Sequence, residues 1–228
     1  MITLVNPRTH AVFLNKVHMD IIYYNCTSLG GFCCGLLLLD IATQYSWFYG
    51  LKKTKSNNII NYLSQFWADA SQLPKHFHAN FDRKWIGGKC LWWIDDNKSK
   101  TISAPEKRHS AKGLVKCICH TLIQTGCEYL TENQIPCKYY YWVTIHGNCI
   151  TNHVPGRLNR KLTSPFELVH GVKPDLWTWF ELFTIGFFHH QEYGNFSRSK
   201  SKYQTMAGIS ISRCPLSSNT AFYNPNKW

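Results

Sequence analysis

The sequence predicts an α/β fold in which a mixed, five-stranded sheet is flanked by helices. Three observations lead to this prediction. Three apolar runs of strand length come first, the apolar spacing changes to a helical one at Ile59, and strand and helix patterns then alternate. The chain has 228 residues, of which 44% are apolar and 15% aromatic, enough to bury one substantial core.

The first three strands are predicted over residues 17–24, 30–40 and 44–51, where β-branched, aromatic and aliphatic residues dominate. The first junction is rich in residues that favour turns: Asn25, Ser28, Gly30 and Gly31. Three consecutive strands with short connections indicate an antiparallel meander.

A helix is predicted after the meander because apolar residues then recur at intervals of three and four. The residues that form this apolar face are Ile59, Ile60, Leu63, Phe66, Trp67 and Ala70. A short strand over 73–80, a short helix over 87–97 and another strand over 99–104 follow.

Two longer helices are predicted next, one starting near Ser110 and one covering roughly 139–152 before Pro155. Further on, Ser164 and Pro165 have the residue types of a helix start, with the serine as cap and the proline at the first helical position.

The chain is predicted to contain one main domain. Residues 1–15 are interpreted as the remnant of a linker, residues 16–190 as the domain, and residues 191–228 as a basic linker with a partial C-terminal segment of about two strands. The basic stretch SRSKSK, residues 197–202, supports a boundary near 190.

The formal net charge of +12 favours a polyanionic partner, most simply nucleic acid. The longest apolar run, residues 32–39, is far shorter than the roughly 20 residues of a membrane-spanning helix, and the N-terminus lacks the pattern of a secretory signal. We therefore expect an intracellular protein without membrane partners, whose ten cysteines are reduced and mostly buried. The tryptophans are expected in the core.

Five segments occur in the order and spacing of one family: VHMDI, LLLLDIATQYSWFYGLKKTKS, HFHANFD, APEKRHSAKGLVK and LTSPFELVHGVKPD. Across residues 16–190 the chain resembles the integrase catalytic core of copia-type LTR retrotransposons. The resemblance implies a ribonuclease-H-like fold, DNA as partner with no small-molecule substrate, and self-association. It also implies two-metal phosphoryl transfer with Mg²⁺ or Mn²⁺, and a location in the nucleus or in a cytoplasmic retroelement particle.

The family uses two Asp and one Glu as metal ligands, and the resemblance assigns these positions to Asp20, Asn80 and Lys116. Only Asp20 keeps its carboxylate. Between Asn80 and Lys116 lie 35 residues, which is the family's spacing. The resemblance therefore places the metal-ligand positions at the family's spacing, but two of them, Asn80 and Lys116, carry no carboxylate.

The side chains at the three catalytic positions have a net charge of zero, whereas three carboxylates would attract the two divalent metal ions. We therefore expect metal binding at Asp20 to be weak or absent, and an ion pair between Lys116 and Asp20 in place of the ions. Four other acids are not expected to replace the missing ligands, because of their spacing or position: Asp40, Asp82, Glu106 and Glu128.

The basic residues around the second and third motifs are candidates for contact with DNA phosphates. The predicted nucleic-acid-binding residues are Lys84, Lys107, Arg108 and Lys112, with Lys98 and Lys100 nearby. A zinc site at Cys117, Cys119 and His120 is disfavoured, because neighbouring side chains of one helix cannot all face one ion.

The leading interpretation is an integrase core that has lost catalysis. The alternative is a non-catalytic DNA-binding module derived from an integrase, for which duplex affinity should fall steeply with salt and need no metal. A third is a relic with a weakened fold, which a missing cooperative melting transition would reveal.

Overall fold

The computed structural model describes residues 5–6, 11–79, 88–103, 113–155, 163–175, 185–191, 203–213 and 220–223. The chain divides into two compact units, Met1–Pro174 and Asp175–Trp228. The predicted limit of the main domain, residue 190, lies inside a strand of the second unit.

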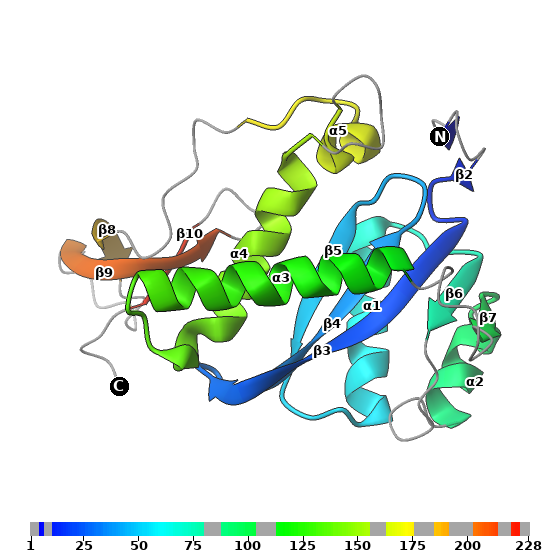
Figure 1. Cartoon of the computed structure of the whole chain (residues 1–228), viewed down its shortest axis with the longest axis horizontal. Helices are drawn as coiled ribbons and strands as arrows, with labels where there is room; N and C mark the ends of the chain where they lie inside the picture. The colour runs from blue at the N-terminus through cyan, green and yellow to red at the C-terminus, as the bar shows by residue number, and fades with distance from the viewer. Residues whose placement is uncertain are drawn as a thin grey trace, which may run out of the picture. The chain divides into compact units, whose positions relative to one another are not determined.

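The first unit is built on a five-stranded mixed sheet (Figure 1). Its strands are β3 (Lys16–Ser28), β4 (Phe32–Asp40), β5 (Ser46–Leu51), β6 (His76–Ala79) and β7 (Lys100–Ser103). In space they follow the order β5-β4-β3-β6-β7. The meander β3-β4-β5 is antiparallel, whereas β6 pairs in parallel with β3 and with β7. This arrangement confirms the predicted mixed sheet.

Helices cover both faces of the sheet. They are α1 (Ser56–Ala70), α2 (Gly88–Asp96), α3 (Gly113–Glu132), α4 (Tyr140–His153) and α5 (Pro165–His170), with a single 3₁₀ turn, η2 (Cys137–Tyr139), before α4. In the part of the chain that the structure describes, none of these helices is long and apolar enough to cross a membrane.

One face of the sheet packs against α1 and α2. Alternate residues of β4 and β5 point to this side, among them Leu36, Leu38 and Trp47. From α1, Ile59, Leu63 and Phe66 are fully buried against them. These three positions fall at i, i+4 and i+7, which lie within one narrow stripe of a helix.

The opposite face packs against α3 and α4. Leu37, Leu39 and Phe48, which alternate with the residues of the first face, form a second core cluster with Val115 and Leu122 of α3. The strand period of two thus sends neighbouring leucines of β4 to opposite sides of the sheet.

A buried polar network attaches α4 to the start of β5. Asn152 accepts the backbone N–H of Ser46 at 2.9 Å and donates to the Ser46 carbonyl at 2.7 Å. Asn148 accepts the Ser46 hydroxyl at 2.7 Å. Because each buried polar group finds a partner, the network fixes the position of α4 at little cost.

Strand β3 is longer than predicted, because it continues through Asn25 to Ser28 instead of turning there. The reason is tertiary: Ser28 pairs with Phe32 across the hairpin and donates its hydroxyl to the carbonyl of Lys138 at 2.7 Å. The turn itself falls at Gly30 and Gly31, whose φ values of 93° and 82° favour glycine.

The expectation that the tryptophans lie in the core is wrong for two of them. Trp47 is buried, but Trp67 and Trp92 are 44% and 67% exposed. Trp67 comes eight residues after Ile59, which places it about 80° away from Ile59 around the axis of α1, outside the buried stripe. The cysteines also differ from expectation, since only four of the nine described are buried: Cys34, Cys90, Cys119 and Cys149.

Helix α5 starts as predicted. Ser164 has an extended backbone and accepts the backbone N–H of Glu167 at 3.1 Å, and Pro165 occupies the first helical position. The helix ends at His170 and is followed by Gly171 as its C-cap, with a φ of 72°.

The remaining strands form two small antiparallel sheets. Near the N-terminus, β1 (Val5–Asn6) pairs with β2 (Ala11–Val12). In the second unit, β8 (Ile185–Gln191), β9 (Tyr203–Arg213) and β10 (Thr220–Tyr223) form a three-stranded sheet in the order β10-β9-β8.

Candidate active site

Asp20 lies on β3, the central strand of the sheet, and its side chain is half-buried. It shares the strand face of Ile22, which packs with α3 and α4. One carboxylate oxygen, Oδ1, accepts the backbone N–H of Ile21 at 2.9 Å. The other, Oδ2, lies 4.0 Å from the Sγ of Cys119 on α3.

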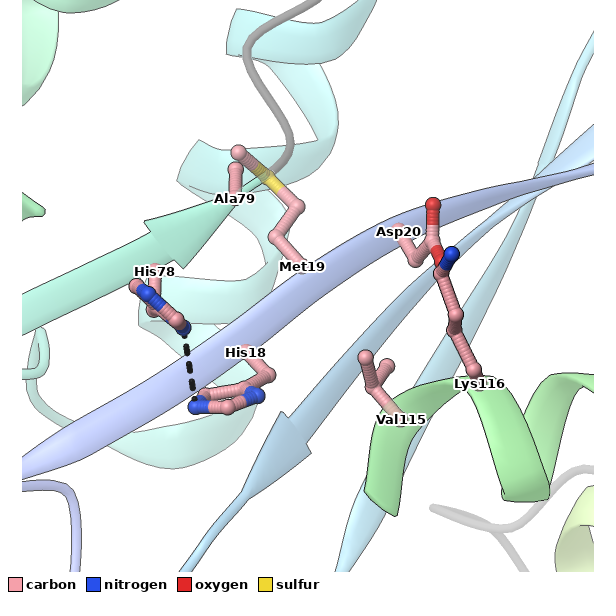
Figure 2. Close-up of a pocket in the computed structure, with 7 residues that line it drawn as sticks. All are labelled: His18, Met19, Asp20, His78, Ala79, Val115 and Lys116. Atoms are coloured by element: carbon pink, nitrogen blue, oxygen red, sulfur yellow. Dashed lines mark hydrogen bonds between the residues drawn. The ribbon is translucent and has the colours of Figure 1, made fainter. Parts of the chain in front are cut away.

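Helix α3 brings Lys116 to this carboxylate. Val115 and Cys119 are buried and attach the first turns of α3 to the sheet, whereas Lys116 between them is exposed. Figure 2 shows the Lys116 side chain extending from the helix with its amino group toward the Asp20 carboxylate. The thiol of Cys119 is affected by its surroundings, since burial and the nearby Asp20 raise its pKa to about 12.

Strand β6, which pairs with the edge of β3 opposite to β4, contributes the remaining residues of the site. It runs parallel to β3 with Met19 opposite Ala79, and it ends at Ala79, one residue before Asn80. Asn80 itself lies outside the described residues, as do the predicted DNA-contacting residues Lys84, Lys107, Arg108 and Lys112.

These three elements line one small pocket (Figure 2). Its lining residues are His18, Met19, Asp20, His78, Ala79, Val115 and Lys116. The structure therefore brings Asp20 and Lys116 together, although 96 positions separate them in the chain, and places beside them the strand end that precedes Asn80.

A buried histidine pair also lines this pocket, and no local sequence pattern predicted it. His18 Nε2 and His78 Nδ1 lie 3.1 Å apart on paired positions of β3 and β6. Burial first, then His78 and Lys16, lower the pKa of His18 to about 4. Both histidines lie inside the motifs VHMDI and HFHANFD, but only the parallel register of β3 and β6 shows that they meet.

The described side chains of the pocket do not fit a pair of divalent ions. Such ions need clustered oxygen ligands, and the pocket offers one carboxylate, two imidazoles and an ammonium group. Among the residues that the structure describes, no group of three or more His, Cys, Asp or Glu is arranged to hold a metal ion.

Asp40 has a structural environment. Its carboxylate is fully buried at the end of β4, where it accepts the backbone N–H of Leu14 at 3.0 Å and both the N–H and the hydroxyl of Thr43 at 2.8 Å. Burial raises the pKa of Asp40, and these hydrogen bonds oppose that shift. The three donors show that Asp40 closes the turn between β4 and β5.

Lys98 and Lys100 do not lie beside the pocket, contrary to the prediction from the sequence. Lys100 begins β7 and pairs with His76, whereas the pocket end of β7 is Ser103, which pairs with Ala79. Three residues of strand separate Lys100 from that end, which is about 10 Å. These two lysines are therefore at the opposite end of β7 from the pocket.

The side chains of the disfavoured zinc motif point in different directions. Cys119 is buried against the sheet, while Cys117 and His120 are exposed. Glu128, further along α3, is exposed and accepts a hydrogen bond from Gln124 at 2.8 Å.

Comparison with known proteins supports the fold. No family model matches the sequence, and no curated protein matches it significantly. The catalytic core of BIV integrase superposes with a TM-score of 0.52 at 10% identity, over 69% of this chain and 94% of that one.

Two further integrase structures are similar to this chain in fold. The magnesium-bound HTLV-2 integrase catalytic core, in a trimeric form, gives a TM-score of 0.51 at 13% identity over 68% of this chain and 96% of its own. A chain of the simian T-cell lymphotropic virus intasome gives 0.57 at 13% identity over 97% and 77%. The first unit of this chain therefore has the ribonuclease-H-like α/β fold of integrase catalytic cores, as the sequence predicted.

Proposed function

We propose that this chain is a copia-type retrotransposon integrase core that has kept the DNA-binding scaffold and lost metal-dependent catalysis. The observation that carries the proposal is the position of Lys116, which occupies the first turn of α3 and points toward the only carboxylate in the described pocket. The fold and the 35-residue spacing from Asn80 support the assignment of this position.

The charge of Lys116 opposes metal binding directly. Two unit charges of the same sign 4 Å apart repel by about 4 kcal/mol at an effective dielectric constant of 20, and a dication doubles this energy. Water screens part of this repulsion because Lys116 is exposed. With Asn in place of the second carboxylate, Asp20 alone has to attract both ions, so two-metal catalysis is not supported.

The comparisons support the choice of partners. One matched structure is described as an intasome, and the HTLV-2 core is described in dimeric and trimeric forms with magnesium. We propose DNA and a second copy of the chain as partners here, in the nucleus or in a cytoplasmic retroelement particle. The net charge of +12 agrees with a DNA partner.

Restoring the two carboxylates tests the proposal. The native chain and the variant Asn80→Asp, Lys116→Glu are assayed for DNA cleavage and strand transfer with Mg²⁺ and with Mn²⁺. We expect no product from the native chain and metal-dependent product from the variant. Activity of the native chain with metal would show that the ligands are wrongly assigned.

A matched control distinguishes the effect of restoring carboxylates in the pocket from the effect of lowering the net charge. The variant Asn57→Asp, Lys89→Glu makes the same residue changes on the exposed surfaces of α1 and α2. It should remain as inactive as the native chain. If it cuts DNA, reduced net charge and not the pocket explains the gain. If neither double variant cuts although both fold, the proposed descent from an active integrase core fails.

The DNA-binding part of the proposal has its own test. Duplex affinity should be equal with EDTA and with Mg²⁺ held at constant ionic strength, and its logarithm should fall linearly with the logarithm of salt concentration. The variant Lys107→Glu, Arg108→Glu should flatten that slope, whereas Lys98→Glu, Lys100→Glu at the far end of β7 should affect it less. Binding that requires metal, or no binding, would contradict a retained DNA-binding module.

A further inference from the structure

Three cysteines from separate parts of the sequence meet at the hairpin end of β3. They are Cys26 on β3, Cys127 on α3 and Cys137 in η2. Cys26 is half-buried, and the other two are exposed. The Sγ of Cys127 donates to the Tyr140 hydroxyl at 3.7 Å, on the helix that follows η2.

The contact between Cys26 and Cys137 is direct. The thiol of Cys26 donates to the carbonyl oxygen of Cys137 at 3.0 Å. Because a cysteine's own Sγ lies within about 5 Å of its carbonyl oxygen, a change of side-chain rotamer can bring the two sulfur atoms together. A disulfide requires Cα atoms roughly 4.4–6.8 Å apart, a range that this contact between β3 and η2 makes accessible.

Hydrogen bonds next to this contact hold the two segments in place. Lys138, next to Cys137, accepts the Ser28 hydroxyl at 2.7 Å and also the backbone N–H of Leu29. The Ser28 oxygen in turn accepts the backbone N–H of Tyr141 at 3.1 Å. The folded chain thus pre-positions Cys26 and Cys137, which lowers the entropic cost of joining them.

We propose that Cys26 and Cys137 form an intramolecular disulfide when the protein meets a small-molecule disulfide oxidant such as glutathione disulfide. The pair is independent of the proposed integrase site, because Cys26 lies six residues from Asp20, about 20 Å along β3. The bond would join the end of the central strand to the segment that begins α4.

The reaction balances with the oxidant alone. The exposed Cys137 loses its proton to water and attacks one sulfur of glutathione disulfide, which forms a mixed disulfide and releases one glutathione thiolate. Cys26, once deprotonated, attacks the Cys137 sulfur and releases the second glutathione. Two protein thiols are oxidised and one glutathione disulfide is reduced to two glutathione molecules.

Burial and the neighbouring thiols of Cys137 and Cys127 raise the pKa of Cys26 to about 11. This shift makes Cys26 the slower thiol and assigns it the second step. The exposed position of Cys137 assigns it the first.

The test is oxidation of the folded full chain with glutathione disulfide, followed by alkylation of the remaining thiols and peptide mapping. Trypsin together with a glutamate-specific protease leaves Cys137 as the only cysteine in residues 133–138 and separates it from Cys127. We expect this peptide linked to the one that contains Cys26, in a monomer whose melting temperature is above that of the reduced chain.

Single variants identify the partners. Cys26→Ser and Cys137→Ser should each remove the link, whereas Cys127→Ser and the control Cys117→Ser, also on α3, should keep it. In the Cys26→Ser variant, Cys137 should accumulate as the glutathione adduct. A link from Cys26 to Cys127, links only between two chains, or a Cys137 adduct that never resolves in the native chain would overturn the proposal.

Discussion

The two faces of the five-stranded sheet come from the same alternating strands but differ in what covers them. On the side of α1 and α2, the strands meet a closed apolar layer centred on Phe66 and Phe77. On the side of α3 and α4, the apolar layer around Leu37 and Leu122 gives way near the start of α3 to His18, Asp20 and Lys116. The difference shows that one face supplies stability and the other combines stability with a polar site.

The largest effect is expected from the apolar face. Phe66 is fully buried, with its ring centroid 4.9 Å from that of Trp47 and 6.2 Å from that of Phe77. Phe66→Ala should lower the free energy of unfolding by about 3–5 kcal/mol, because it removes buried surface and leaves a cavity. Urea unfolding measures this change. The neighbouring Trp67→Ala, on the exposed side of α1, should cost less than about 1 kcal/mol, and equal losses would contradict the assignment of faces.

A smaller loss is expected at the turn that joins β4 to β5. Asp40→Ala leaves the N–H of Leu14 and both donors of Thr43 without their buried acceptor. We expect a loss of about 3 kcal/mol in the free energy of unfolding, since each unsatisfied buried donor costs roughly 1–3 kcal/mol and partial hydration offsets some of it. Asp95→Ala, at an exposed position of α2, is the control. An Asp40 variant as stable as this control would show that the turn does not depend on the carboxylate.

The polar face should make stability depend on pH. The pKa of His18 is lowered from its ordinary 6.5 to about 4, so between these values the unfolded chain binds a proton that the folded chain does not. This histidine's contribution is therefore complete above pH 6.5 and is lost as the pH falls toward 4. Urea unfolding from pH 4 to 8 should show a shallower acid loss for His18→Gln than for the native chain. His120→Gln, an exposed change on α3, should keep the native profile, and identical slopes for both variants would rule out this role for His18.

The smallest effect concerns α5, which packs Phe166 and Val169 at the edge of the apolar cluster. Ser164→Ala removes the hydroxyl that accepts the Glu167 N–H, and should cost about 1 kcal/mol. Ser164→Thr retains a capping hydroxyl and should recover most of the loss in the same thermal or urea measurement. A threonine variant no more stable than the alanine variant would show that packing, and not the cap, determines the contribution of Ser164.

Local patterns were sufficient to predict the sheet and several of its details. The run Leu36 to Leu39 is apolar throughout because β4 is buried on both faces, and the change of period at Ile59 marks the start of the buried stripe of α1. The cap at Ser164 also followed from residue type alone.

Features that depend on distant contacts could not be predicted in the same way. His18 and His78 are 60 residues apart, and the Cys26 thiol reaches a carbonyl 111 residues away. The extension of β3 to Ser28 depends on η2 as well. The meeting of Asp20 with Lys116 could be anticipated only through family resemblance, because no local spacing relates a strand residue to a helix 96 positions later.

The central position of β3 also has a consequence for the order of folding. The pairing of β3 with β4, and of β4 with β5, closes short loops. The parallel pairing of β3 with β6 and its cover by α3 require loops of about 50 and 90 residues, which are entropically slower to close. We therefore expect the meander to nucleate folding and the pocket to assemble last. Leu38→Ala should then slow refolding, while Val115→Ala should chiefly accelerate unfolding.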